Sequence, residues 1–463
     1  MSRRKILIRN GLCVLDDGTW KKDILICGEK IETVFPESPD NPAADADEII
    51  EAEGKLVMSG GIDPHVHFSL PLPGGIHSAD DFKSGSAAAL AGGTTSIIDF
   101  ITPAPEESLD AASEKRLKEA ESCLCDYSLH FSIVKGMKDI KNQLKTCSER
   151  YGIRSCKIYL AYQDTIGLKD DAAFEVFKAA SELGIKLLVH CEWGEAVDFQ
   201  RKEFLRQGKT EALYHAASRP VWTEQAAIAK ACKMAELCGT ELYAVHVSTA
   251  EGIGEIMKAR QRGVKVNAEV CLHHLLLDDS RYTKNDKKAP LYIMTPPLRP
   301  AIQKKALWKF AKAWIIGNIS TDHCPFMKAE KLKPDNFGSV PNGVNGVEER
   351  VLLFLNEAVN VQGFSLAQAS GLLSGNAADF FRLKGKSGRI EEGSDADLAI
   401  IDINKETEIS AGLHHSCSDY NCYEGFKTDF GIADVFRRGE HIVNNGELTK
   451  TAGRGEFLVR SLD

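Results

Sequence analysis

The middle of the chain, residues 58–380, alternates short apolar runs with amphipathic segments. Seven runs have the composition of buried strands, and they read TTSIIDF, YSLHFSIV, CKIYLA, KLLVHCE, LYAVHVS, KVNAEVC and NISTDHC. An eighth run leads into residues 60–68. Helical patterns such as 170–184 and 223–239 lie between them and close on glycine, as helix C-termini often do. Eight strand–helix units predict an α/β fold, a (β/α)8 TIM barrel, with an open doubly wound sheet as the alternative.

The two ends of the chain, residues 1–57 and 381–463, have a different pattern. Their apolar positions alternate with period two and are interrupted by Gly, Asn and Asp turns, as in KILIRNGLCVLD and IADVFRRGEHIVNNGELT. Neither end would bury an apolar face alone. We therefore expect both ends to combine into one smaller, discontinuous β-sandwich domain beside a barrel domain of residues 58–380.

Composition and charge narrow the class of protein. The 463 residues are 43% hydrophobic and 27% charged with a net charge of −9, as in an ordinary globular enzyme. No basic stripe and no long apolar run occur, so we expect neither nucleic acid nor a membrane as a partner. The first residues do not resemble a signal peptide, which favours a cytoplasmic protein.

Thirteen cysteines, an odd number, are spread along the chain. The pairs Cys123/Cys125 and Cys417/Cys422 lack the doubled CxxC spacing of a zinc ribbon. We expect reduced thiols that serve as small core residues. One long stretch, residues 328–346, is rich in Gly, Pro and Asn and is predicted to be a mobile loop, a kind of segment that is often functional.

Metal-binding residue types recur where the predicted barrel strands end. His65 and His67 follow the first strand two residues apart, which places both imidazoles on one side of an extended segment. His190, His246 and Asp322 end the fifth, sixth and eighth strands. Active sites of barrels lie at the C-terminal ends of the strands. These five residues therefore predict a metal site.

Five ligands exceed the three that one catalytic zinc ion usually takes, and they suit two metals about 3.5–4 Å apart with a hydroxide between them. Two adjacent dications need an anionic bridge. The fourth strand offers no acid, only Lys157. Carboxylated by CO2, a lysine becomes a carbamate with two oxygens that can span two metals. Spacing alone favours instead a lysine whose ammonium reaches the surface.

Six motifs occur in an order that resembles the cyclic amidohydrolases, most closely the dihydropyrimidinase/D-hydantoinase family. They are GGIDPHVHF, SCKIYLAYQ, LLVHCEWGE, AVHVST, MTPPLR and STDHCPF, and the resemblance extends over nearly the whole chain. It implies that Lys157 is carboxylated (N6-carboxylysine) and bridges two divalent metal ions. Zinc is expected, although manganese and cobalt accept similar ligands.

The same resemblance implies roles for the strand-end residues. His65, His67 and Asp322 would bind the more buried metal ion, and His190 and His246 the other. Asp322 would also shuttle a proton from the nucleophile to the leaving ring nitrogen.

Substrate contacts are implied at further positions. Tyr162 would stabilise the oxyanion, and backbone groups of Thr295 and Asn342 would hold the imide edge of the ring. The pocket around the ring substituent is expected to contain Leu72, Tyr159 and Ile166. Three features depart from the family pattern: Gln163 follows Tyr162 where many members have lysine, Thr295 replaces a serine, and the loop before Asn342 differs in length.

The implied reaction is hydrolysis of the ring amide of a cyclic ureide, a hydantoin or a 5,6-dihydropyrimidine, to an N-carbamoyl amino acid. Dihydroorotase is an alternative because EVCLHHLLLD is similar to a dihydroorotase stretch, but the segment after His67, FSLPLPGG, lacks the arginine that binds a substrate carboxylate. Allantoinase is another, although its usual EPG is LPG here. A non-catalytic binding protein of the same family would have lost metal ligands, and none is missing here. The resemblance also implies a homotetramer.

Overall fold

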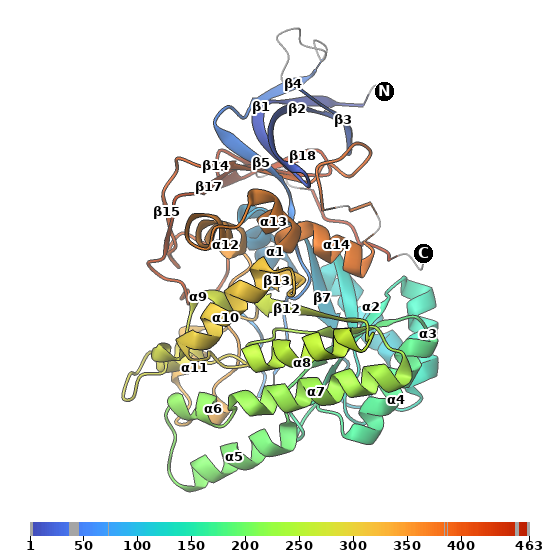
Figure 1. Ribbon diagram of the computed structural model, residues 1–463, viewed down its shortest axis with the longest axis vertical. Helices are drawn as coiled ribbons and strands as arrows, with labels where there is room; N and C mark the ends of the chain where they lie inside the picture. Colours follow the sequence, from blue (N-terminus) through green and yellow to red (C-terminus); the bar gives the residue numbers. More distant parts are fainter. Residues whose placement is uncertain are drawn as a thin grey trace.

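The computed structural model describes residues 3–36, 46–72, 74–383, 385–386, 388–449 and 453–460. An eight-stranded parallel sheet lies at its centre in the order β13-β12-β11-β10-β9-β8-β7-β6, so each strand pairs with its neighbour in the sequence. An isolated parallel bridge between Val66 and His323 joins the segments that follow the first and last strands. The sheet is therefore nearly closed, which confirms the predicted barrel (Figure 1).

The barrel strands are short, and seven of the eight are buried at every position, because helices cover the outside and side chains fill the inside. The strands are β6 (Gly61–Asp63), β7 (Thr94–Ile101), β8 (Asp126–Ser132), β9 (Ser155–Tyr159), β10 (Lys186–His190), β11 (Leu242–Ala244), β12 (Val266–Cys271) and β13 (Asn318–Ser320).

Helices follow the strands along the chain (Figure 1). Up to β13 they are α1 (Phe82–Ala91), α2 (Leu109–Ala120), α3 (Ile140–Tyr151), α4 (Asp170–Glu182), α5 (Gly194–Arg206), α6 (Leu213–Ala217), α7 (Val221–Cys238), α8 (Ala250–Gln261), α9 (Leu272–Leu276) and α10 (Ala301–Lys312). After it come α11 (Lys328–Leu332), α12 (Arg350–Leu355), α13 (Leu366–Ser370) and α14 (Asn376–Phe381). As predicted, α7 ends at a left-handed glycine, Gly239, whose N–H donates to Ala235. In the described part of the chain, none of these helices combines the length and apolar character needed to cross a membrane.

Strands from both ends of the chain form a second, mixed sheet in the order β19-β18-β17-β14-β5-β1-β2-β3, with β4 beside β1. Its strands are β1 (Lys5–Leu15), β2 (Gly18–Cys27), β3 (Lys30–Pro36), β4 (Glu48–Glu51), β5 (Lys55–Ser59), β14 (Leu398–Asp402), β17 (Gly431–Arg437), β18 (Glu440–Asn444) and β19 (Glu447–Leu448). The two ends meet where β14 pairs antiparallel with β5. A separate core packs Ile6, Ile8 and Ile24 against Leu398 and Phe436. The predicted pairing of the termini is confirmed, and Figure 1 shows this sheet beyond one end of the barrel.

The last described residues return to the amino-terminal side of the barrel. Phe457 forms a parallel bridge with Tyr127 near the start of β8. Arg460 is buried, and its guanidinium donates to the Ser128 hydroxyl at 3.0 Å. This segment therefore covers the end of the barrel opposite to the C-terminal ends of the strands.

Residues 328–346 differ from the predicted mobile loop. The stretch contains α11 and a 3-10 turn at Phe337–Ser339. Lys331 in α11 is fully buried, and its Nζ donates to the carbonyls of Ile293 at 2.7 Å and Gly343 at 2.6 Å. The turn-forming composition had indicated a loop, but this buried lysine fixes the segment against residues 290–295.

Candidate metal centre

His65, His67 and Asp322 meet where the first and last barrel strands end. Their ligand atoms all lie within 4.8 Å of one another, as in a group that could hold a metal ion. Oδ1 of Asp322 is 3.2 Å from Nε2 of His65 and 3.1 Å from Nε2 of His67. Asp322 has a left-handed backbone (φ 49°), which is uncommon for a residue other than glycine and is typical of functional sites.

His190 and His246 form a second pair beside the first. Nδ1 of His190 lies 3.0 Å from Nε2 of His246, and their ring centroids are 4.6 Å apart. The ring of His246 is 5.4 Å from that of His65, so all four imidazoles belong to one cluster. His246, like Asp322, has a left-handed backbone (φ 39°).

Lys157 in β9 points into this cluster. It is 1% exposed, and its Nζ lies 2.8 Å from Nε2 of His65 and 4.4 Å from the centroid of the Phe100 ring. Among the described residues, no carboxylate oxygen is within ion-pairing distance of this amine. Burial lowers the pKa of Lys157 to about 8. The alternative of a lysine that reaches the surface is therefore wrong.

The electrostatics of the cluster suit metal ligands. Burial lowers the pKa of His65 to about 3 and that of His67 to about 4, which leaves neutral imidazoles with free lone pairs at neutral pH. Burial opposes ionisation of Asp322, but His65 and the hydrogen bond with His67 hold its pKa well below the ordinary value. Neutral imidazoles and a carboxylate are the donor set that a divalent zinc-like ion takes.

Two buried glutamates orient the histidines. Glu269 in β12 contacts Nδ1 of His65 and accepts a hydrogen bond from the Tyr243 hydroxyl at 3.1 Å. Glu192 lies 2.8 Å from Nε2 of His190 and accepts a 2.6 Å hydrogen bond from Arg219. Such carboxylates fix the tautomer and the ring orientation of ligating histidines. The strand-end pattern does not indicate a role for these two residues, although a charged residue inside the apolar run KVNAEVC is a signal for Glu269.

Two of the residues expected to contact substrate, Tyr162 and Tyr159, lie beside His190 of this cluster. The ring of Tyr162 is 5.2 Å from that of His190, and the ring of Tyr159 is 6.2 Å from both. Burial raises the pKa of the Tyr162 hydroxyl, so it stays protonated and can donate. Thr295 is buried, and its hydroxyl has no hydrogen-bond partner among the described residues.

Asn342 lies on a segment next to that of Thr295. The N–H of Gly343, which follows Asn342, donates to the carbonyl of Ile293 at 3.0 Å. Leu72 and Ile166 are half-buried in the loops that follow β6 and β9. Their place in the lining of a pocket stays a prediction.

Comparison with known proteins gives one consistent result. Residues 56–442 match the amidohydrolase family. A D-hydantoinase of Geobacillus stearothermophilus is 36% identical over 98% of this chain and 96% of its own length, and a dihydropyrimidinase of Arabidopsis thaliana is 36% identical over 99% and 86%. The crystal structure of a dihydropyrimidinase from Brevibacillus agri superimposes with a TM-score of 0.94 at 34% identity, covering 99% of both chains. The protein therefore belongs to the amidohydrolase family.

Proposed function

We propose that the protein hydrolyses the ring amide of a cyclic ureide, a hydantoin or a 5,6-dihydropyrimidine, and releases an N-carbamoyl amino acid. The observation that supports this most directly is the cluster of four buried histidines, the buried Lys157 and the half-buried Asp322 at the C-terminal ends of the barrel strands. Relatives named D-hydantoinase and dihydropyrimidinase match over nearly the full chain.

We further propose that the cluster holds two divalent metal ions, zinc in the first place, and that Lys157 carries a CO2-derived carbamate between them. The ligands would be His65, His67 and Asp322 for one ion and His190 and His246 for the other. When bound, such a pair lowers the pKa of a shared water molecule and polarises a carbonyl group. The low pKa of Lys157 favours this assignment, because only the neutral amine reacts with CO2.

The chain's own residues would handle the protons and the substrate. Asp322 would accept the proton of the nucleophilic water and deliver it to the leaving ring nitrogen. The protonated Tyr162 hydroxyl would donate a hydrogen bond to the tetrahedral oxyanion. Backbone groups of Thr295 and Asn342 would hold the imide edge of the ring, while Leu72, Tyr159 and Ile166 would contact its substituent.

The charges around Tyr162 favour a neutral ring over an acidic one. The guanidinium of Arg219 lies 5.7 Å from the centroid of the Tyr162 ring, but it already forms an ion pair with Glu192 at 2.6 Å. A substrate carboxylate would have to compete with Glu192 for this cation. We therefore rank hydantoins and dihydropyrimidines above dihydroorotate.

A panel of substrates tests the assignment. The protein, supplied with zinc or manganese, would be assayed with dihydrouracil, hydantoin, phenylhydantoin, allantoin and dihydroorotate. We expect the largest kcat/KM with one of the first three. A larger value for allantoin or dihydroorotate would replace the proposed substrate class, and a metal-loaded protein that opens none of the rings would refute a hydrolytic role.

We also propose that the protein is a cytoplasmic homotetramer in which the barrel unit spans residues 58–380 and the terminal unit combines 1–57 with 381–463. All thirteen cysteines are free, which agrees with a reducing compartment. Light scattering of the purified protein would give the number of chains, and a mass other than four chains would contradict the tetramer.

A further inference from the structure

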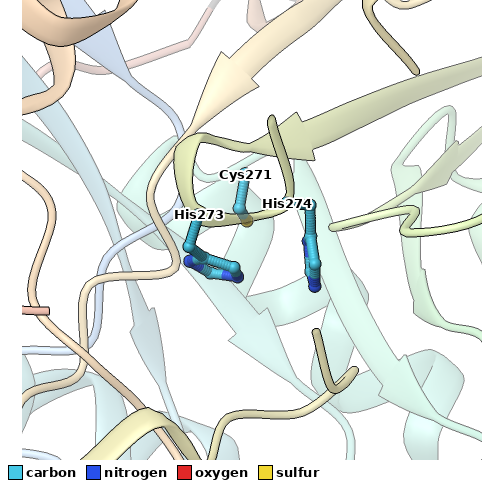
Figure 2. Close-up of side chains that lie close together, drawn as sticks. All are labelled: Cys271, His273 and His274. Carbon is cyan, nitrogen blue, oxygen red and sulfur yellow. The ribbon is translucent and has the colours of Figure 1, made fainter. Parts of the chain in front are cut away.

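A second group of metal-binding residue types lies at the C-terminal end of β12. Cys271 ends that strand, and His273 and His274 follow in the short helix α9. Figure 2 shows their side chains gathered around one point. Their ligand atoms all lie within 4.8 Å of one another, and the three residues are at most 3% exposed. None of them belongs to the cluster proposed for catalysis.

Both imidazoles present a buried nitrogen that has no hydrogen-bond partner in the part of the chain that the structure describes. Nε2 of His274 is 3.1 Å from the carbonyl oxygen of Pro296, so Nε2 carries the proton and donates it. The Nδ1 lone pair of His274 is therefore free, and among the described residues it has no hydrogen-bond partner; neither has Nδ1 of His273. Buried polar atoms are seldom left unpaired in folded proteins. A histidine that binds a metal ion through one ring nitrogen usually donates the N–H of its other ring nitrogen to a carboxylate, a backbone carbonyl or water.

The donor set selects the kind of ion. One thiolate and two imidazoles suit zinc and softer d10 ions, whereas magnesium and calcium require oxygen ligands. Ligands bound tetrahedrally to zinc at about 2.0–2.3 Å lie about 3.5 Å apart. Side-chain movements of about 1 Å would therefore bring Cys271, His273 and His274 to bonding distance.

We propose that Cys271, His273 and His274 form a separate binding site for one zinc-like, thiophilic divalent ion. On binding, the Cys271 thiol loses its proton to solvent, the thiolate sulfur forms a bond to the ion, and one nitrogen lone pair of each histidine completes a three-ligand set. A water molecule would occupy the fourth position. Because His274 also holds Pro296, which follows Thr295, the site is linked to the segment expected to contact substrate.

Cadmium is a suitable probe because its bond to a thiolate gives an ultraviolet charge-transfer band, and the ligands proposed for the catalytic centre include no cysteine. Cadmium chloride would be added to the metal-loaded protein, and bound cadmium and absorbance would both be followed. We expect the band to appear together with one additional equivalent of bound metal per chain. Cys271→Ser should abolish the band and this equivalent.

Two further variants sharpen the test. His274→Gln keeps an amide N–H that can donate to Pro296 but removes Nδ1, and it should weaken cadmium binding at least tenfold. Cys232→Ser changes another buried cysteine, in α7, and should leave the band unchanged.

A band of full strength in Cys271→Ser, or no additional equivalent in the unmodified protein, would overturn the proposal. The result does not depend on the proposed function. A protein that shows the band but opens no cyclic ureide would refute the function and support this site.

Discussion

Nζ of Lys157 lies 2.8 Å from Nε2 of His65, inside the barrel and without a carboxylate in ion-pairing distance among the described residues. An ammonium is costly in such a place, and burial lowers the pKa of Lys157 accordingly. Carboxylation would turn this unfavourable cation into an anion beside the residues that we propose as ligands of two divalent metal ions. The contact of a buried amine with His65 therefore supports the proposed carboxylation of Lys157.

Lys157→Ala should bind less metal and lose activity by orders of magnitude, because the anionic bridge is missing. A short carboxylic acid added to this variant should partly restore both, since it can occupy the vacated position. Lys157→Arg serves as the control that should not be rescued, because the guanidinium stays charged and fills the space. Metal analysis and the intact mass of the native protein check the outcome. An unmodified Lys157 in a fully loaded, active protein would exclude the carbamate.

Asp322→Asn should keep the fold and much of the metal but lose the proton acceptor. General acid–base residues typically contribute about 10²–10⁴-fold, so we expect a fall in kcat of at least that size. The measurement is kcat at matched metal content. Turnover close to that of the unmodified protein would show that another group moves the proton.

Glu269→Ala should weaken metal binding by about 10–100-fold, the usual effect of removing a carboxylate that orients a ligating histidine. Competition with a chelator measures this affinity. Glu241→Ala is a matched control, because Glu241 pairs with Lys186 at 2.7 Å, away from the cluster, and should leave the affinity unchanged. Equal affinities in the two variants would mean that His65 does not depend on Glu269.

Tyr159→Ala should change the preference between small and aryl-substituted hydantoins by tens of fold, because each pocket methylene contributes only about 1–3 kcal/mol to discrimination. The ratio of kcat/KM values across the substrate panel is the measurement, with Tyr159→Phe as a control that retains the ring. If the ratio does not change in Tyr159→Ala, Tyr159 is not part of the pocket.

Lys331 predicts a pH dependence of stability. Burial lowers its pKa from 10.5 to about 7 in the folded protein. Between these values the unfolded chain binds the additional proton, so the contribution of Lys331 to stability rises with pH in this window, by up to about 1.4 kcal/mol per pH unit. Below about pH 7 both states are protonated and the contribution is constant. In Lys331→Met this dependence is absent.

The melting temperatures of the unmodified protein and Lys331→Met, compared from about pH 7 to about pH 9, test the sign. The melting temperature of the unmodified protein should increase relative to that of Lys331→Met as the pH rises. If the difference between the two melting temperatures stays constant over this pH range, Lys331 does not titrate there.

The barrel and the positions of the candidate ligands could be predicted from local pattern alone. Buried strands with helices between them specify parallel pairing, and parallel pairing brings every C-terminal strand end to one side. This rule places His65 and Asp322 on the same side of the barrel, although they are 257 positions apart in the sequence. The period-two alternation at both ends of the chain likewise predicts a shared sheet, because neither end could bury its apolar face alone.

Other features depend on contacts between segments that no local pattern connects. The partnership of Glu269 with His65 spans 204 residues, and the burial of Lys331 between two backbone carbonyls reverses the loop expected from Gly, Pro and Asn content. The protonation of His274 at Nε2, which leaves its Nδ1 lone pair free in the described part of the chain, depends on the carbonyl of Pro296, which lies on another segment. Composition and periodicity determine which faces of strands and helices are buried, whereas side-chain partners across the core are decided only when those faces pack together.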